Sequence, residues 1–297
     1  MPLFTVPLEA TSLNLKTFLQ QHKISATTYK ACKKQGLCQI NGQIVQRNVL
    51  LSPGDTVCLT FPPEDCQLET AEGDLAIIYE DDYFLVVNKP AGLLVHPTGQ
   101  EKDSLANRLA AYSLRKERPF GIHPVLRLDQ ETSGLVLFAK NSAVQYALTQ
   151  TPLAKEYLAL THGCPPSLSG TITAPIGRKP GSIIERQVDA KGQAALTYYH
   201  VLATNNRISL IKFSLGTGRT HQIRVHSAFL GCPLIGDHLY GAPGTKSRHF
   251  LHAYKLKLTH PFTNEALAWE LSLPPDMLDY MEKENLCYNK YIKNFRR

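Results

Sequence analysis

The sequence lacks the patterns that mark membrane, secreted and metal-binding proteins. No apolar run approaches the roughly 20 residues that a membrane-spanning helix needs, and residues 1–5 lack the basic and then apolar stretch of a secretory signal. The seven cysteines are scattered without a C-x-x-C pair, and His221 and His226 form no H-E-x-x-H pattern. We therefore expect a cytoplasmic protein with reduced, mostly buried thiols, no metal and no membrane contact.

Patterns for nucleotide binding and for serine hydrolysis are missing as well. Residues 216–218 are rich in glycine, but neither G-x-G-x-x-G nor G-x-x-x-x-G-K-[ST] follows a strand there. Residues 241–247 end in Lys-Ser yet lack the glycine before the lysine. The G-x-S-x-G elbow of the hydrolases does not occur. The sequence therefore indicates no cofactor, and we expect none.

Charge is distributed unevenly along a chain of otherwise ordinary composition. The 297 residues are 43% hydrophobic and carry a formal net charge of +7. Residues 1–61 carry +4, residues 62–82 carry −8, and the remainder carries +11. Two basic blocks separated by an acidic strip favour two modules that each face a polyanion. A solvated surface with a chance excess of lysine is the alternative.

The first basic block, residues 1–61, has the pattern of a compact α/β unit. Leu15, Phe18 and Leu19 have the spacing of one helix face. A second helix is predicted between the N-cap Ser25 and Gly36. Three lysines share one side of it: Lys30, Lys33 and Lys34. Residues 37–45 alternate around Asn-Gly, which predicts a hairpin, and a turn at residues 53–55 precedes a strand at residues 56–61.

This order of elements resembles the S-four-type RNA-binding domain over about residues 12–61. The resemblance implies that the second helix and the hairpin present cations, including the three lysines, to structured RNA. Members often have an arginine where this chain has Ala26, so we expect modest RNA affinity. A basic face on a generic accessory domain is the alternative. Residues 62–74 have the polar, proline-bearing composition of a linker.

One segment beyond the linker, residues 123–140, concentrates chemically useful side chains. It places Asp129 between Arg127 and a Thr-Ser-Gly turn, before an apolar strand at residues 135–139. A carboxylate at the rim of a strand and beside a fixed cation suits a nucleophile or a transition-state stabiliser. Turns rich in Asp, Thr, Ser and Gly are also common as purely structural features. The spacing alone leaves both interpretations open.

Further segments combine reactive or anion-binding side chains with short strands and loops. Strands are predicted at residues 75–79 and 83–88, and the second ends in a Pro/Gly loop at residues 88–97. A strand-like run at residues 154–160 exposes Lys155 and Tyr157 on the same face. The remaining two segments are residues 216–226 and 231–241.

Together these segments resemble the RluA branch of the RNA pseudouridine synthases, in order, over about residues 75–275. The signatures are R-L-D-x-x-T-S-G and G-R-T-H-Q-I-R-V-H. The resemblance implies an α+β fold with a mixed, largely antiparallel sheet flanked by helices and loops. It implies an isomerase that converts uridine to pseudouridine in RNA. The expected substrate is ribosomal RNA, above all that of the large subunit, or transfer RNA. We expect it to be a monomer.

The resemblance also implies roles for individual residues. Asp129 would be the essential carboxylate at the ribose–base bond, and Arg127 would displace the target base from its helix. Tyr157 would stack on that base and assist proton transfer, while Arg224 would pair with Asp129. The adjoining pocket would be shaped by Arg219 and His221.

Two points stay open at this stage. Members commonly have His-Arg-Leu-Asp, and here Leu126 takes the place of that histidine, for which nearby His123 could partly substitute. Residues 276–297 end in a basic stretch that could be a helix or a frayed arm.

The rival function is a non-catalytic RNA-binding or RNA-chaperone protein, and a weaker alternative is an interaction protein for acidic partners. Steep salt dependence of RNA binding would argue against the latter.

Overall fold

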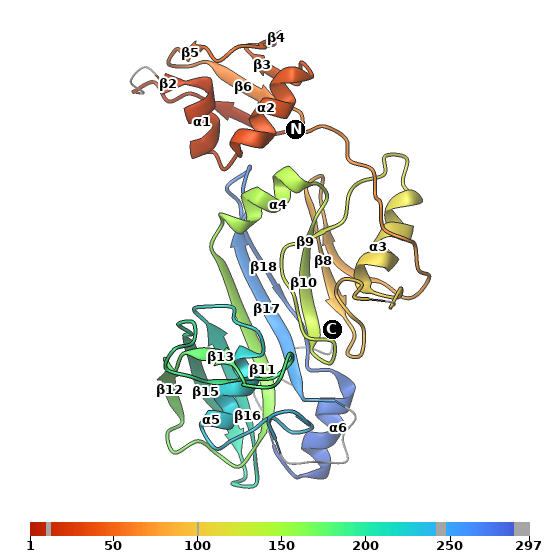
Figure 1. Ribbon diagram of the computed structural model, residues 1–297, viewed down its shortest axis with the longest axis vertical. Helices are drawn as coiled ribbons and strands as arrows, with labels where there is room; N and C mark the ends of the chain where they lie inside the picture. Colours follow the sequence, from red (N-terminus) through yellow and green to blue (C-terminus); the bar gives the residue numbers. More distant parts are fainter. Residues whose placement is uncertain (10–12, 100, 242–247, 288–297) are drawn as a thin grey trace.

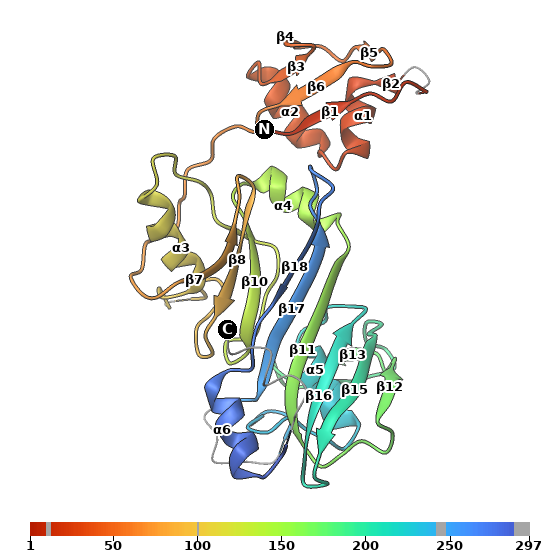
Figure 2. The same ribbon diagram turned by 180° about the vertical axis from the view of Figure 1, so that it is seen from behind.

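The computed structural model describes residues 1–9, 13–99, 101–241 and 248–287. Figures 1 and 2 show a small N-terminal module, residues 1–61, at one end of a larger body built on a long sheet. Residues 62–74, the connecting segment, run between them and contain neither helix nor strand. The strand predicted at residues 75–79 begins one residue later, at Ala76.

The N-terminal module forms around the elements that its sequence predicts. Leu15, Phe18 and Leu19 are buried on one helix face, and the Ser25 hydroxyl accepts the Thr28 N–H at 3.0 Å as an N-cap. Its elements are β1 (Leu3–Thr5), β2 (Leu13–Asn14), α1 (Leu15–Gln21), α2 (Ala26–Lys34), β3 (Cys38–Ile40), β4 (Gln43–Ile44), β5 (Leu50–Leu51) and β6 (Thr56–Leu59).

The Asn-Gly hairpin is confirmed, and three short strands were not foreseen. Asn41 and Gly42 have φ of 51° and 79° between β3 and β4, the left-handed pair that a tight two-residue hairpin turn requires. They are β1, which pairs antiparallel with β6 at the edge of the order β1-β6-β3-β4, and β2 and β5, which pair with each other. Three residues are too few to carry a visible alternation, so only the pairing with β6 defines β1.

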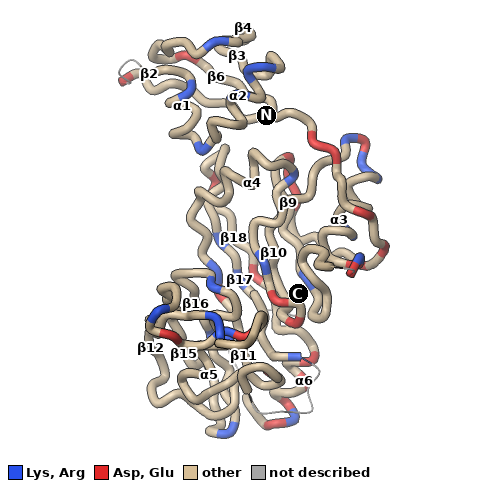
Figure 3. Tube along the Cα trace, in the orientation of Figure 1, with Lys and Arg blue, Asp and Glu red and all other residues tan. Residues whose placement is uncertain are grey.

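The connecting segment lies along the larger body and is bound to it. The Asn107 amide donates to the Glu69 carbonyl at 2.7 Å, and Lys102 Nζ lies 2.9 Å from Glu69 Oε2. The Glu64 carboxylate accepts the Ser142 N–H and contacts His123 Nε2 at 2.7 Å. Its acidic positions stand out between the two bodies in Figure 3. The polar composition predicted a linker, and in the structure carboxylates of this segment bind it to the larger body.

The larger body contains a ten-stranded mixed sheet, which confirms the expected fold class. The path runs β12-β15-β16-β11-β17-β10-β8-β7, with β18 on β17 and β9 on β10. The strands are β7 (Ala76–Glu80), β8 (Phe84–Lys89), β9 (His123–Pro124), β10 (Ser133–Ala139), β11 (Leu153–His162), β12 (Ser169–Ile172), β15 (Thr197–Thr204), β16 (Ile208–Leu215), β17 (Leu251–Thr259) and β18 (Ala266–Glu270).

The two halves of this sheet meet at a short parallel junction. Among the described strands only β10 and β17 pair in parallel, through Ser133 with His252 and Gly134 with Ala253. All other strand pairs in the sheet are antiparallel. The Asp129 turn immediately precedes β10, so the segment of greatest chemical interest lies at this junction.

Helices cover both faces of the sheet near the junction. All seven residues of β10 are buried, because α3 (Leu105–Leu114) packs on one face and α4 (Ser142–Thr149) on the other. A strand buried on both faces needs a continuous apolar run, which the sequence from Leu135 to Ala139 provides. None of the helices in the described ranges is long and apolar enough to cross a membrane.

The other half of the sheet carries a helix, a hairpin and the start of the C-terminal tail. They are α5 (Gln222–Phe229), β13 (Ile176–Arg178) with β14 (Arg186–Val188), and α6 (Pro275–Lys283). Met277 and Met281 of α6 are buried against the sheet, so the tail begins as a helix. Its basic end lies outside the described residues.

The cysteine expectation is confirmed. All seven thiols are free, and four of them are buried. Burial raises the pKa of both Cys32 and Cys38 to about 11, so these two thiols stay protonated and unreactive near neutrality.

Candidate active site

Asp129 lies on a tight turn that is pressed against the neighbouring strand. The Thr132 N–H donates to the Asp129 carbonyl at 3.0 Å and closes the turn. Gly134 then enters β10 with φ +115°, and a Cβ atom there would lie 2.3 Å from the Ala253 carbonyl oxygen. Only glycine tolerates both conditions, so the Thr-Ser-Gly sequence allows the Asp129 turn to sit directly beside β17.

The buried side chain of Lys89 holds this turn in place through hydrogen bonds. The Lys89 side chain is fully buried, and its Nζ donates to the carbonyls of Pro90, Leu93 and Gln130 at 2.9, 2.7 and 2.7 Å. Burial lowers the pKa of Lys89 to about 7. The amine ties the Pro/Gly loop after β8 to the residue that follows Asp129, which fixes the position of the turn.

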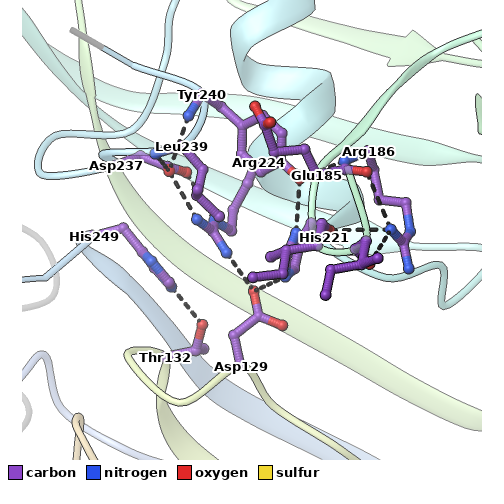
Figure 4. Close-up of polar contacts among 12 residues, drawn as sticks. Asp129, Thr132, Glu185, Arg186, His221, Arg224, Asp237, Leu239, Tyr240 and His249 are labelled. Atoms are coloured by element: carbon purple, nitrogen blue, oxygen red, sulfur yellow. Dashed lines mark hydrogen bonds and ion pairs between the residues drawn. The ribbon is translucent and has the colours of Figure 1, made fainter. Parts of the chain in front are cut away.

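Arg224 connects two carboxylates in the centre of the site. Its Nε and Nη2 each lie 2.8 Å from an oxygen of Asp237, and its Nη1 lies 3.1 Å from Asp129 Oδ2. Figure 4 shows the guanidinium between the two acids. The Asp237 side chain is fully buried, whereas the Asp129 side chain is 28% exposed. Burial would raise the pKa of Asp237, but the hydrogen bonds and charge of Arg224 outweigh it and keep that pKa below its ordinary value. Asp237 thus orients the arginine, and Asp129 keeps an accessible oxygen.

His221 lies on the other side of Asp129, at the start of α5. Its Nε2 is 3.8 Å from Asp129 Oδ2, and its Nδ1 is 2.7 Å from the Tyr240 hydroxyl. Burial lowers the pKa of His221, and the charge of Asp129 offsets this only in part. The backbone of His221 is left-handed, with φ 57°, and its side chain makes no capping bond to the helix.

Tyr157 enters the site from β11. It lies at an irregularity in the β11–β17 pairing, between Glu156 and Leu158, and is 8% exposed. Burial, followed by the charge of Asp129, raises the pKa of Tyr157 well above its ordinary value, so the phenol stays neutral. Its ring supplies an apolar surface beside the carboxylate.

Two hollows open on either side of Asp129. The larger, about 290 Å³, is lined by residues that include Ile184, Arg248 and His249. The smaller, about 70 Å³, is lined by residues that include Tyr157 and Arg219. Both hollows share Asp129, His221 and Arg224. A planar ring held in one hollow could therefore reach the same carboxylate as a sugar held in the other.

Comparisons with known proteins identify the family. The model of the RNA pseudouridylate synthase family matches residues 83–229. An uncharacterized RNA pseudouridine synthase of Bacillus subtilis is 38% identical over 84% of this chain and 83% of its own length. The chain belongs to the RNA pseudouridine synthase family. As an RNA pseudouridine synthase it is an isomerase, as the resemblance implied.

Other relatives agree with this assignment. The ribosomal large subunit pseudouridine synthase D of Nitrosomonas europaea is 39% identical over 72% of this chain and 67% of its own length. Among solved structures, the human RNA pseudouridylate synthase domain containing 4 superposes with a TM-score of 0.58 at 27% identity. That match covers 71% of this chain and 94% of the human one.

The structure brings most of the predicted site residues of this synthase together. Asp129, Tyr157, Arg224, Arg219 and His221 all line the hollows. Arg127 lines the smaller hollow too and is exposed at its rim. The three lysines Lys30, Lys33 and Lys34 lie instead on α2, at the far end of the molecule in Figure 1.

His123 does not replace the missing histidine of the synthase signature. It lies on β9, where Glu64 of the connecting segment holds its Nε2, and it lines neither hollow. Leu126, which stands where the signature has histidine, packs against the hydrophobic core.

Several site residues were missed by sequence reasoning. Asp237 and Tyr240 fall in a segment already singled out, but no spacing links them to Arg224. Lys89 is likewise in a recognised loop, with no signal that its amine is buried. His249 accepts or donates a hydrogen bond to Thr132 Oγ1 at 2.8 Å, and burial lowers its pKa to about 4. Such partners become visible only when distant strands are placed side by side.

Proposed function

We propose that this synthase converts specific uridines of ribosomal RNA, in the large subunit, to pseudouridine, and that Asp129 is its essential carboxylate. The observation that carries the proposal is the Arg224–Asp129 contact at 3.1 Å between two hollows. The choice of RNA rests on relatives named for the large ribosomal subunit, such as the enzyme of Nitrosomonas europaea.

The geometry supports a division of labour among the site residues. Asp129, held by Arg224, faces the ribose–base bond, where positive charge develops on the sugar as the bond breaks. The buried ring of Tyr157 stacks on the uracil and retains it while it turns. Arg127, exposed at the rim, fills the space that the uridine leaves in its helix, which offsets part of the few kcal/mol that base extrusion costs.

Cations outside the hollows extend the proposed RNA path. A third depression of about 400 Å³ beside the β13–β14 hairpin is lined by Arg178, Arg186, Lys191 and Arg219. Arg219 lines both this depression and the smaller hollow. In Figure 3 basic positions gather on the loops in front of β11 and β16. We assign this surface to the phosphates that flank the target uridine, and the lysines of α2 to more distant RNA.

The test is to map pseudouridine in cellular RNA with and without the protein, and to attempt rescue with variants. Asp129→Asn keeps the size of the side chain and removes its charge, so we expect no rescue at positions that the unsubstituted protein restores. Asp82→Asn, an exposed acid on the β7–β8 turn, is the matched control and should rescue fully.

Each outcome bears on a different part of the proposal. Full rescue by Asp129→Asn would contradict the catalytic assignment. Missing modifications in transfer RNA alone would contradict the choice of ribosomal RNA. RNA binding without any modification would favour the non-catalytic RNA-binding function instead.

A further inference from the structure

The isomerisation requires a group that removes a proton from carbon. The N1–C1′ bond of uridine breaks, a C5–C1′ bond forms, the C5 proton leaves, and N1 gains a proton. No oxidant or reductant takes part. Once C5 is joined to the ribose it still carries its hydrogen, so a base with an available electron pair must lie beside the ring.

We propose that His221 is this base: its Nε2 takes the proton from C5 after the uracil has been rejoined to the ribose. The inference rests on the proposed function and adds a residue to it. His221 lines both hollows, and its Nε2 lies 3.8 Å from Asp129 Oδ2. A group that lies so close to the carboxylate at the ribose also lies beside the base attached to that ribose.

The hydrogen bonding of the imidazole leaves Nε2 able to accept. The 3.8 Å gap to Asp129 exceeds a hydrogen bond, so Nε2 does not donate to the carboxylate. Nδ1 lies 2.7 Å from the Tyr240 hydroxyl, and the Arg186 N–H donates to that same hydroxyl at 2.8 Å. We place the ring proton on Nδ1, where Tyr240 accepts it, and Tyr240 is then the positioning residue.

The surroundings of the ring suit proton acceptance followed by release. Four charged groups face it: Asp129, Arg224, Asp237 and Arg186. Burial keeps the imidazole neutral near pH 7, and Asp129 stabilises the imidazolium once Nε2 has taken the proton. From Nε2 the proton passes to N1 or exchanges with water through the larger hollow.

Several other side chains in the hollows are less suited to this step. Tyr157 is a neutral buried phenol. Asp129 is bound to Arg224, and the proposed function already assigns it to the ribose. His249 has its Nε2 occupied by Thr132. Arg127, Arg219 and Arg224 are permanent cations without an acceptor.

The backbone at His221 supports a functional constraint. A left-handed conformation is strained for a residue other than glycine, and the side chain does not offset this strain by capping α5. The conformation directs the imidazole toward Asp129 instead, as Figure 4 shows. Strain of this kind persists where the position of a side chain is needed.

The experiment uses the full chain and large-subunit ribosomal RNA transcribed with either ordinary or 5-deuterated uridine. His221→Gly fits the left-handed backbone and leaves space for added imidazole. We expect the rate of pseudouridine formation to fall about 10²–10⁴-fold. We also expect the ordinary RNA to react measurably faster than the deuterated RNA, because proton removal becomes rate-limiting. Added imidazole should restore part of the rate.

Asn206→Gly is the matched control, since Asn206 also has a left-handed backbone, with φ 68°, and is exposed outside the hollows. It should keep the wild-type rate and be indifferent to imidazole. A His221→Gly protein at wild-type rate, or a slow one with no isotope effect and no imidazole rescue, would overturn the assignment of His221. A wild-type protein that forms no pseudouridine in this RNA would overturn the proposed function itself.

Discussion

At the scale of single residues, the site depends on buried polar side chains that hold one another in fixed positions. Asp237 occupies two nitrogens of Arg224 and leaves a third for Asp129. A guanidinium held in this bidentate way has little freedom to rotate, so its remaining N–H points in a fixed direction. The direction of the charge that Asp129 meets is therefore set by Asp237, a fully buried carboxylate.

Buried neutral histidines at the junction make the stability of the fold depend on pH. Burial lowers the pKa of His249 to about 4, and an unfolded histidine titrates near 6.5. Between these values the unfolded chain binds more protons than the folded one, so stability is lost as pH falls from about 6.5 to 4. His249→Gln can still bond Thr132 and removes this titration. In urea unfolding between pH 6.5 and 4.5, the variant should lose less stability than the wild type, by up to about 1.4 kcal/mol per pH unit.

The exposed His162 provides the comparison. His162→Gln should follow the wild-type pH curve. Parallel curves for wild type and His249→Gln would contradict the proposed contribution of His249.

At the scale of elements, the position of the Asp129 turn depends on how closely β10 approaches β17. The two strands share only two paired positions, and the first of these also joins the Ser133 hydroxyl to His252 Nδ1 at 2.9 Å. Elsewhere β10 pairs with β8 over six residues from Gly134 to Ala139. The short contact is the one that places Asp129 next to α5 and β11.

Gly134→Ala tests the close approach. The added methyl group would meet the Ala253 carbonyl at 2.3 Å and would stand on a backbone with φ +115°. We expect the free energy of unfolding to fall by about 2–4 kcal/mol, since overpacking and backbone strain combine. Chemical denaturation measures this directly.

Gly163→Ala is the matched control, because Gly163 has φ +68° but open space around the new methyl group. Its cost should be limited to about 1 kcal/mol of backbone strain. Equal losses for the two variants would show that contact with β17 adds nothing.

At the scale of the whole molecule, the N-terminal module is joined to the larger body by direct contacts. The rings of Phe61 and Phe262 lie 5.6 Å apart, and Lys23 Nζ donates to Thr151 Oγ1 at 3.1 Å. Core residues of both bodies form one continuous hydrophobic cluster. The lysines of α2 therefore lie at a fixed distance from Asp129. This arrangement suits an RNA that is long enough to contact α2 and the Asp129 site at the same time.

Replacing Lys30, Lys33 and Lys34 with glutamine tests this arrangement. We expect weaker binding of folded ribosomal RNA and a salt dependence whose log–log slope is lower by up to about 3, since each phosphate contact contributes about 0.7–0.9. Binding titrations at several salt concentrations measure both. Modification of a short RNA that carries only the target region should be unchanged. An unaltered slope would contradict a role for α2 in RNA binding.

Local patterns predicted local structure well and long-range partners poorly. The Ser25 cap, the Asn41-Gly42 hairpin and the apolar run of β10 depend on neighbours a few residues away, so the sequence shows them. The Asp129–Arg224 contact joins residues 95 positions apart, and only the resemblance to a family suggested it. Asp237, Tyr240 and His249 carry no such signature, because their positions follow from how strands assemble.

The parallel junction of β10 and β17 also determines at what point during synthesis the Asp129 turn can reach its final position. Asp129 leaves the ribosome early. The adjoining Ser133 hydroxyl hydrogen-bonds to His252, which is synthesised 119 residues later. Arg224 and Asp237 are likewise translated after most of the sheet. A nascent or truncated chain that ends before β17 therefore carries the Asp129 carboxylate without the strand pairing that positions its turn. The Asp129 turn and its partners can therefore assemble only once the chain is nearly finished.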